Sequence, residues 1–251
     1  MYDGTFEGFL TAIFEIYDQK ITPVAITGSK EHQAYLFAEE MTVTTNEVQS
    51  DRVWNAIKKL VSKNGTLMIY HAFLVQENEI EMKLYALIRE IFDKKYDATC
   101  NMSNLNTFDI LQAKRRVTNE AHRTQMFVRF QKSADNIYFS IIDPEYDVLP
   151  LIVDHFKSRF ADQQWLIFDK RREYGMYYNL HETTQVTFTE TNFNTQTGEL
   201  NENIVAEDQE HYGDLWKVFF KATTIKERKN LRLQRQHMPK RYWKFLTEMQ
   251  P

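Results

Sequence analysis

A basic segment near the C-terminus carries the clearest chemical signal in this sequence. From Lys217 to Lys244 there are ten lysines or arginines and a single acid, Glu227, which gives the segment a formal charge of +9. The whole chain has a net charge of −4, so the remainder carries −13. Positive charge concentrated in an otherwise acidic protein indicates a surface that meets an anion.

The cations of this segment are interleaved with aromatic side chains, a mixture typical of nucleic-acid binding. Cations neutralise phosphates and release counterions, while aromatic rings stack on unpaired bases. We expect Tyr242 and Trp243 to stack or to anchor the segment, and the phosphate contacts to come from Arg228, Lys229, Arg232, Arg235, Lys240, Arg241 and Lys244. The alternative is a solvated basic helix that pairs with the protein's own acidic surface, with Trp243 and Phe245 anchored in the core.

A second group of cations lies on a helix predicted over residues 105–123. At about 100° per residue, one arc of roughly 120° on this helix contains Arg115, Arg116, Asn119, His122 and Arg123. Such a face can extend the C-terminal basic surface or bind a phosphate. The alternative is a solvated face in which Glu120 is the internal partner of the arginines.

Catalytic motifs are absent from the sequence. There is no His-Glu-x-x-His zinc pattern, no Gly-rich phosphate loop, no Gly-x-Ser-x-Gly elbow and no dinucleotide fingerprint. The single cysteine, Cys100, excludes an iron–sulfur cluster held by several cysteines of this chain. We therefore predict no cofactor and no metal site. His122 is the one weak catalytic candidate, and an enzyme would require it to converge with Asp169 or Asp143 in a cleft beside Arg123.

Composition places the chain among ordinary globular proteins. Of its 251 residues, 43% are hydrophobic and 26% are charged, close to the globular average. No apolar run approaches the roughly 18 residues of a transmembrane helix, and the first residues lack the pattern of a signal peptide. A single cysteine fits a reducing compartment. We expect a cytoplasmic protein without a membrane partner.

Apolar periodicity predicts an α+β fold, with a mainly helical N-terminal half. Thr5 is a suitable N-cap for the first helix, whose apolar face includes Phe6, Phe9 and Ile13. Further helices are predicted over residues 50–63, 66–76, 79–95 and 105–123, with Asn64-Gly65 ending the first of these. A short strand is predicted over residues 40–45, and residues 23–28 are expected to form either a short buried strand or a connection.

The period changes after residue 124. Strands joined by turns are predicted at Met126–Phe130, Ile137–Ile141, Trp165–Phe168, Tyr174–Tyr178 and Gln185–Phe188. Asp147 can cap a helix that has Pro150 in its first turn, and a final helix is predicted from about Ala206 to Ala222. The second half is therefore an antiparallel sheet with covering helices. We place the boundary between residues 1–124 and 125–251, with a single core shared by both halves as the alternative.

Several stretches of the chain resemble a bacterial family of unknown function labelled probable DNA metabolism proteins. The resemblance covers nearly the whole chain and is carried by Tyr2–Glu15, Arg116–Arg123, Met126–Phe130, Leu149–Phe160, Trp165–Arg172, Gly175–Tyr178 and Arg228–Leu246. Members of that family occur with a radical-SAM protein of DNA modification or repair, and related domains are fused to modules similar to uracil-DNA glycosylase. The family has no settled mechanism and no catalytic residues to transfer.

The resemblance implies a bacterial DNA repair or modification role together with a partner protein. Any radical chemistry belongs to the radical-SAM partner, because this chain lacks the clustered cysteines that an iron–sulfur cluster needs. The leading hypothesis is a DNA-binding accessory protein. The alternatives are an enzyme that processes DNA or a nucleotide at a His/Arg phosphate site, and an interaction module that does not contact DNA.

Overall fold

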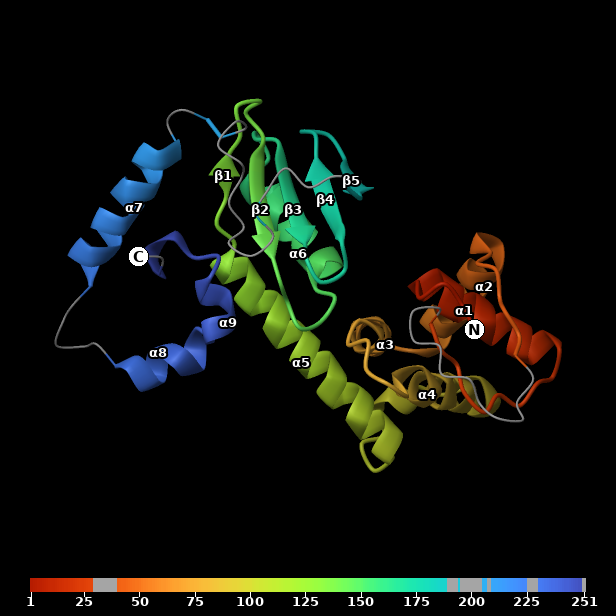
Figure 1. The fold of residues 1–251 in the computed structure, drawn as a ribbon. Helices are drawn as coiled ribbons and strands as arrows, with labels where there is room; N and C mark the ends of the chain where they lie inside the picture. Colours follow the sequence, from red (N-terminus) through yellow and green to blue (C-terminus); the bar gives the residue numbers. More distant parts are fainter. Residues whose placement is uncertain (29–39, 189–193, 195–204, 207–208, 225–229, 250–251) are drawn as a thin grey trace. The chain divides into compact units, whose positions relative to one another are not determined.

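The structure is a computed structural model that describes residues 1–28, 40–188, 194, 205–206, 209–224 and 230–249 (Figure 1). The chain divides into two compact units, Met1–Thr118 and Asn119–Pro251. The long helix α5, Leu105–Phe127, contains both this division and the predicted boundary near residue 124. Among the described residues, no helix combines the length and the apolar character that a membrane crossing requires.

Unit 1 is built from helices whose apolar stripes meet in one core. In addition to the first part of α5, it contains α1 (Phe6–Asp18), α2 (Glu47–Leu60), α3 (Lys63–Phe73), α4 (Ile80–Lys94) and the 3-10 turn η2 (Ala98–Cys100). Thr5 caps α1 as predicted, because its side chain accepts a hydrogen bond from the Gly8 amide. The fully buried side chains include Phe9, Ile13, Ile57, Ile69, Leu84, Leu87, Ile88, Ile91 and Ile110.

Two predictions for unit 1 were wrong. Residues 40–45 form no strand. Gly65 does not end a helix but lies inside α3, which Ser62 caps by accepting from the Gly65 amide. A Cβ atom at position 65 would collide with Thr99 and Val61, so glycine here permits close packing of α3.

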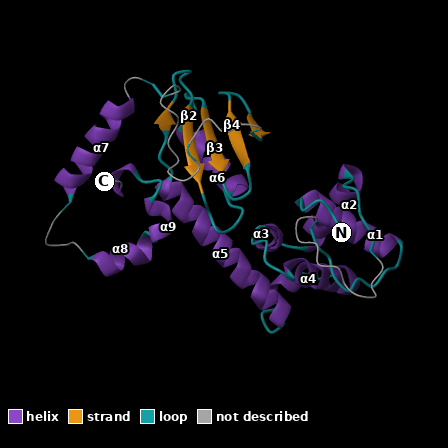
Figure 2. Ribbon diagram, viewed as in Figure 1, coloured by secondary structure: helices purple, strands orange, loops and turns teal. Residues whose placement is uncertain are grey.

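Unit 2 contains a five-stranded sheet (Figure 2). The strands lie in sequence order, and they are β1 (Gln131–Lys132), β2 (Tyr138–Ile142), β3 (Trp165–Asp169), β4 (Tyr174–Tyr178) and β5 (Thr183–Val186). Helix α6 (Leu149–Arg159) joins β2 to β3 and lies against one face of the sheet, where the Phe156 ring contacts the Trp165 ring. The α+β class, with a helical first half and a sheet with helices in the second, is confirmed.

The sheet is mixed rather than wholly antiparallel. β2 and β3 run parallel, with Tyr138 opposite Trp165 and Ile142 opposite Asp169, while the other pairs are antiparallel. A helical crossover such as α6 returns the chain in the same direction, which makes the two strands it joins parallel. The predicted strand Met126–Phe130 was also wrong, because α5 continues to Phe127 and the next strand begins only at Gln131.

After the sheet, the described residues form four short or medium helical elements. They are α7 (Gln209–Thr223), α8 (Leu231–His237), α9 (Lys240–Trp243) and the 3-10 turn η4 (Thr247–Met249). Asn230 caps α8, since its side-chain oxygen accepts hydrogen bonds from the amides of Arg232 and Leu233. Tyr242 and Leu246 are buried, so the last of these elements belong to the core of unit 2.

Candidate nucleic-acid interface

A network of carboxylates and arginines lies at the carboxyl ends of the parallel strands β2 and β3. Asp143 follows the last residue of β2, and Asp169 is the last residue of β3. The carboxyl ends of neighbouring parallel strands meet at one edge of a sheet, where open α/β sheets place their functional groups. We call the set formed by Glu120, Asp143, Glu145, Asp147, Asp169, Arg171, Arg172 and Tyr174 the strand-end network.

Asp169 is the most deeply buried member of the strand-end network, with no exposed surface. Its Oδ1 accepts from the amides of Arg171 and Arg172 at 2.9 and 3.2 Å, and its Oδ2 accepts from the Arg172 guanidinium at 3.0 Å. Burial raises the pKa of Asp169 to about 6, although the Arg172 charge and its hydrogen bonds act in the opposite direction. These bonds fix the turn between β3 and β4.

Asp147 supports β4 rather than a helix. The Tyr174 hydroxyl donates to Asp147 Oδ1 at 2.6 Å, and burial raises the pKa of this carboxyl group despite that bond. The residue at the N-cap of α6 is Val148, which makes no side-chain cap bond. The predicted capping role of Asp147 was therefore wrong, whereas Pro150 does lie in the first turn of α6.

Part of the C-terminal basic segment binds to the strand-end network. Arg241 donates to the carboxylate of Glu120 and to that of Glu145, the latter at 3.0 Å. Lys244 donates to Asp143 at 2.6 Å. Burial opposes ionisation of Asp143, but the hydrogen bond and charge of Lys244 act in the opposite direction together with the charges of Arg171 and Lys170, and the pKa of Asp143 is lowered. These two predicted phosphate contacts are thus engaged with the protein's own acids.

The aromatic residues of the same stretch anchor it to unit 2. Tyr242 is 6% exposed, and its ring lies 4.9 Å from the ring of Phe127 at the end of α5. The Trp243 indole N–H donates to the Met238 carbonyl at 3.0 Å, which fixes the ring between α8 and α9. Of the two roles expected for these rings, anchoring describes Tyr242, whose ring is enclosed.

Three of the predicted phosphate contacts point to solvent. Arg232, Arg235 and Lys240 are exposed, and within the described part of the chain none of them has a hydrogen bond or an ion pair. All three belong to α8 or α9. The predicted contacts Arg228 and Lys229 lie outside the described residues. We call Arg232, Arg235 and Lys240 the free cations of α8 and α9.

The basic face predicted on α5 falls on both sides of the division between the units. In unit 1, Arg115 is exposed, and Arg116 donates to Glu77 from both terminal guanidinium nitrogens at 2.5 and 2.6 Å. In unit 2, His122 is exposed and Arg123 is half-buried. Arg116 is thus paired with an acid, and the single basic face stays a prediction.

The acid–base arrangement of the enzyme hypothesis is missing from the described contacts. In that part of the chain, His122 forms no hydrogen bond or ion pair with Asp143 or Asp169. Asp143 is engaged with Lys244, and Asp169 is enclosed with Arg172. Within the same described ranges, no three His, Cys, Asp or Glu side chains gather where they would bind a metal ion.

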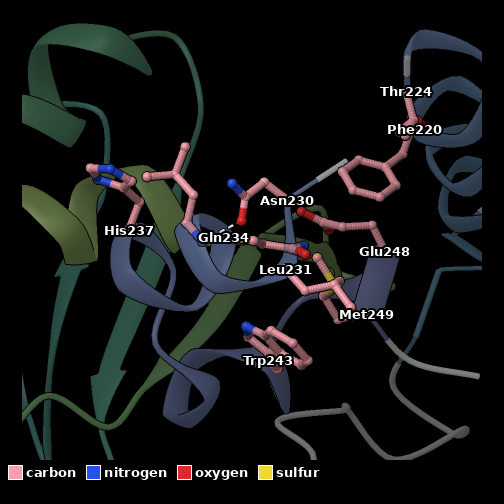
Figure 3. A pocket seen from close by; sticks show the side chains of 10 residues that line it. Phe220, Thr224, Asn230, Leu231, Gln234, His237, Trp243, Glu248 and Met249 are labelled. Carbon is pink, nitrogen blue, oxygen red and sulfur yellow. Dashed lines mark hydrogen bonds between the residues drawn. The ribbon is translucent and has the colours of Figure 1, made fainter. Parts of the chain in front are cut away.

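An open groove lies between α7, α8 and the final residues of the chain (Figure 3). It has a volume of about 640 Å³. Phe220 lines it from α7 and Thr224 from the residue after that helix, and the other side consists of Asn230, Leu231, Leu233, Gln234, His237, Trp243, Glu248 and Met249. The Glu248 carboxylate forms an ion pair with the Arg129 guanidinium at 2.7 Å and accepts a hydrogen bond from the Trp216 indole N–H at 2.9 Å. Arg129 and the Trp216 bond outweigh the effect of burial, so the pKa of Glu248 is lowered.

Three residues of this region were missed as members of a site. Glu120 and Glu145 receive Arg241, and Lys221 is an exposed cation on α7 next to Phe220. Glu120 lies on the helical stripe of the buried Val117 and Ala121, and a charge on an apolar stripe is a signal that a buried partner exists. The identity of that partner is not encoded locally.

Comparison with protein families gives one relevant match. A family model described as a domain of unknown function, DUF4130, matches residues 78–248. The chain belongs to this family. Comparison with the curated proteins and with the solved structures gives no match. The DUF4130 match covers α4 through the anchored C-terminal segment, so it includes the strand-end network, the free cations of α8 and α9, and the groove.

Proposed function

We propose that this protein is a DNA-binding accessory protein of DNA repair or modification. The free cations of α8 and α9 form the core of the DNA-binding surface. The context of repair or modification, and a radical-SAM protein as the partner, rest on the sequence resemblance alone. The surface residues rest on the geometry of unit 2.

One observation carries this proposal, namely the division of the basic segment into anchored and free cations. Arg241 and Lys244 bind acids of unit 2, whereas Arg232, Arg235 and Lys240 are exposed and have no partner among the described residues. An unpaired exposed cation is available to a phosphate without first breaking an internal ion pair. The anchored residues hold the short helices that carry the free cations.

The physical consequence is a strongly salt-dependent interaction. Each phosphate neutralised by a lysine or arginine releases condensed counterions, and this release favours binding at low salt. Contacts of this kind position the protein on the backbone and carry no sequence information. We therefore expect binding that is tolerant of sequence.

The proposal is tested by a gel-shift and fluorescence-anisotropy comparison of two triple variants. In the first, Arg232→Ala/Arg235→Ala/Lys240→Ala removes the free cations of α8 and α9. In the second, Lys58→Ala/Lys59→Ala/Lys63→Ala removes the same charge from exposed positions of unit 1. The probes are a 25-mer single strand and its duplex at low salt.

We expect the first triple variant to lose at least about tenfold in affinity for every sequence tried, and the second to resemble the wild type. Equal losses in both variants would mean that only net charge matters. Absence of binding by the wild type to either probe at low salt would refute DNA binding itself.

A second candidate, a protein-interaction module, is favoured by the outer surface of α7. Leu215, Val218 and Phe219 are 50%, 64% and 56% exposed, and their spacing puts them on one stripe of the helix. Clustered exposed apolar side chains mark protein interfaces. The candidate predicts that Val218→Glu disrupts co-purification with the radical-SAM partner after nuclease treatment, without changing DNA binding.

A further inference from the structure

We propose that the groove between α7 and α8 receives an unpaired base, which makes single-stranded nucleic acid the substrate class of this surface. This inference rests on the proposed DNA binding and adds a distinct requirement to it. The volume of about 640 Å³ lies within the roughly 300–1,000 Å³ of small-molecule sites, so the groove has room for a nucleotide.

Aromatic side chains line the groove from two different helices. Phe220 lines it from α7 and Trp243 from α9 (Figure 3). The bond from the Trp243 indole N–H to the Met238 carbonyl fixes that ring without occupying its faces. Stacking of bases on aromatic rings is tolerant of sequence, because every base has a π-face. A duplex, in which the bases are already stacked and paired, cannot use these rings.

Two polar side chains in the groove are available to a base. Gln234 and His237 line it from the same side of α8, and no hydrogen bond engages either side chain within the described part of the chain. A glutamine amide offers both donors and an acceptor, and an imidazole offers one or two ring nitrogens. These groups match the edge of a base, which also presents donors and acceptors. An apolar peptide side chain offers no donors or acceptors to the Gln234 amide and the His237 imidazole.

Both rims of the groove carry a positive charge. Lys221 follows Phe220 on α7, and Arg235 lies four residues after Leu231 on α8, a spacing that puts it beside the groove. Both are exposed and have no partner among the described residues. A strand with one base in the groove would place its flanking phosphates near these two cations.

The single acid in the lining does not oppose this ligand. Glu248 is ion-paired with Arg129, and its side chain is only 3% exposed. A phosphate or a base in the groove therefore meets a neutralised carboxylate. The groove is apolar at its walls, polar at two points and cationic at its rims, which is the chemistry of a nucleotide site.

The test compares Phe220→Ala with Phe219→Ala, its neighbour on α7, which is 56% exposed and does not line the groove. Gln234→Leu is a second groove variant that preserves the size and the helix propensity of the side chain. Fluorescein-labelled oligothymidylate and a duplex of the same length are the probes, read by anisotropy. A third probe is a labelled acidic amphipathic peptide, the alternative occupant.

We expect the wild type to prefer oligothymidylate to the duplex, and Phe220→Ala to lose about tenfold on the single strand. Phe220→Ala should change little on the duplex, Gln234→Leu should also weaken single-strand binding, and Phe219→Ala should match the wild type. Unlabelled oligothymidylate should quench the intrinsic tryptophan fluorescence of the wild type, and Trp243→Phe should remove that quenching.

Two results would overturn the base site. One is equal affinity of the wild type for the single strand and the duplex, and the other is unchanged single-strand binding by both groove variants. Either result would leave DNA binding by α8 and α9 intact. Binding of the peptide that Phe220→Ala abolishes, with oligothymidylate binding unchanged, would assign the groove to a protein ligand. If the wild type binds neither the single strand nor the duplex, the proposed function itself is refuted.

Discussion

At the scale of residues, the decisive feature is the pairing of Arg241 with Glu120. The Glu120 side chain is 2% exposed, and its second oxygen accepts from the Glu145 amide. A carboxylate with so little access to water is unfavourable unless a cation and hydrogen-bond donors satisfy it. Arg241 is therefore a structural arginine, although it lies within a segment that sequence reasoning assigned to phosphate binding.

Substitution of Arg241 tests this role. Arg241→Met leaves Glu120 buried and unpaired, and we expect a loss of about 2–3 kcal/mol in the free energy of unfolding. This is below the roughly 3–5 kcal/mol of a fully buried pair, because the guanidinium is partly exposed. Urea denaturation gives the value. In a double-mutant cycle with Glu120→Gln, the losses should be clearly non-additive, and additive losses would show that the two residues do not interact.

The buried Asp169 gives a prediction with a defined pH window. Its pKa is raised from 3.8 to about 6, so between these values the folded protein keeps a proton that the unfolded chain has lost. Stability conferred by the protonated carboxyl group then declines as pH rises through that window. We expect the stability of the wild type relative to Asp169→Asn to fall from pH 4 to pH 6.

Thermal unfolding of both proteins across pH 3.5–8 measures this difference. Above pH 6 the relative stability should be constant, because Asp169 is ionised in both states and Asn does not titrate. A relative stability that rises with pH would mean that Arg172 dominates over burial and lowers the pKa of Asp169.

At the scale of elements, local patterns predicted the helices of unit 1 and the hairpin β3–β4, but not every boundary. The stripe of Phe9 and Ile13 repeats at helical spacing, and such a pattern is complete within one element. The short run Met126–Phe130 suits either a helix or a strand. It is helical up to Phe127, where the ring contacts Tyr242, a residue far away in the sequence.

The same limit applies to the candidate site. The sequence predicts a basic segment because charge is visible in composition, yet Arg241 and Arg235 look alike there. They differ because Glu120 and Glu145 lie next to Arg241 in the fold. The groove was not predicted, since Phe220 and Trp243 belong to different elements that only tertiary structure brings together.

The N-cap of α8 gives a prediction at this scale. Helix α8 has seven residues, too few for stability without tertiary contacts and a cap. Asn230→Ala removes two hydrogen bonds to the first turn, and we expect a cost of about 1 kcal/mol together with a several-fold loss of DNA affinity. Asn230→Ser retains a capping oxygen and is the control. Anisotropy and circular dichroism report the two effects, and unchanged affinity of Asn230→Ala would contradict the role of α8.

At the scale of the whole molecule, charge is separated along the chain. The protein is acidic with a net charge of −4, yet a single segment carries +9. At physiological salt the Debye length is roughly 8 Å, so the acidic remainder repels a more distant anion only weakly. The charge of the local surface therefore decides whether an anion binds there. In the proposed binding to DNA, this separation of charge favours approach through the basic segment.

The salt dependence of DNA affinity measures the number of phosphate contacts. On duplex DNA the slope of log affinity against log salt is about −0.9 per neutralised phosphate. Removal of Arg232, Arg235 and Lys240 should therefore reduce the steepness of that slope by about 3. Lys244→Ala should leave the slope unchanged, since Lys244 binds Asp143. A change of about 1 in the slope of Lys244→Ala would show that its internal ion pair opens on DNA.

The pairing of Arg241 with Glu120 also bears on the order of events during synthesis. The two residues are 121 positions apart, so the ribosome completes α5 and the whole sheet before Arg241 exists. Until then Glu120 lacks its cation, and the ring of Phe127 lacks the ring of Tyr242 that packs against it. Closure of a loop this long is slow, and it places the docking of α9 among the last steps of folding. The docking of α9, which carries Lys240 of the free cations, therefore has to wait for α5 and the sheet.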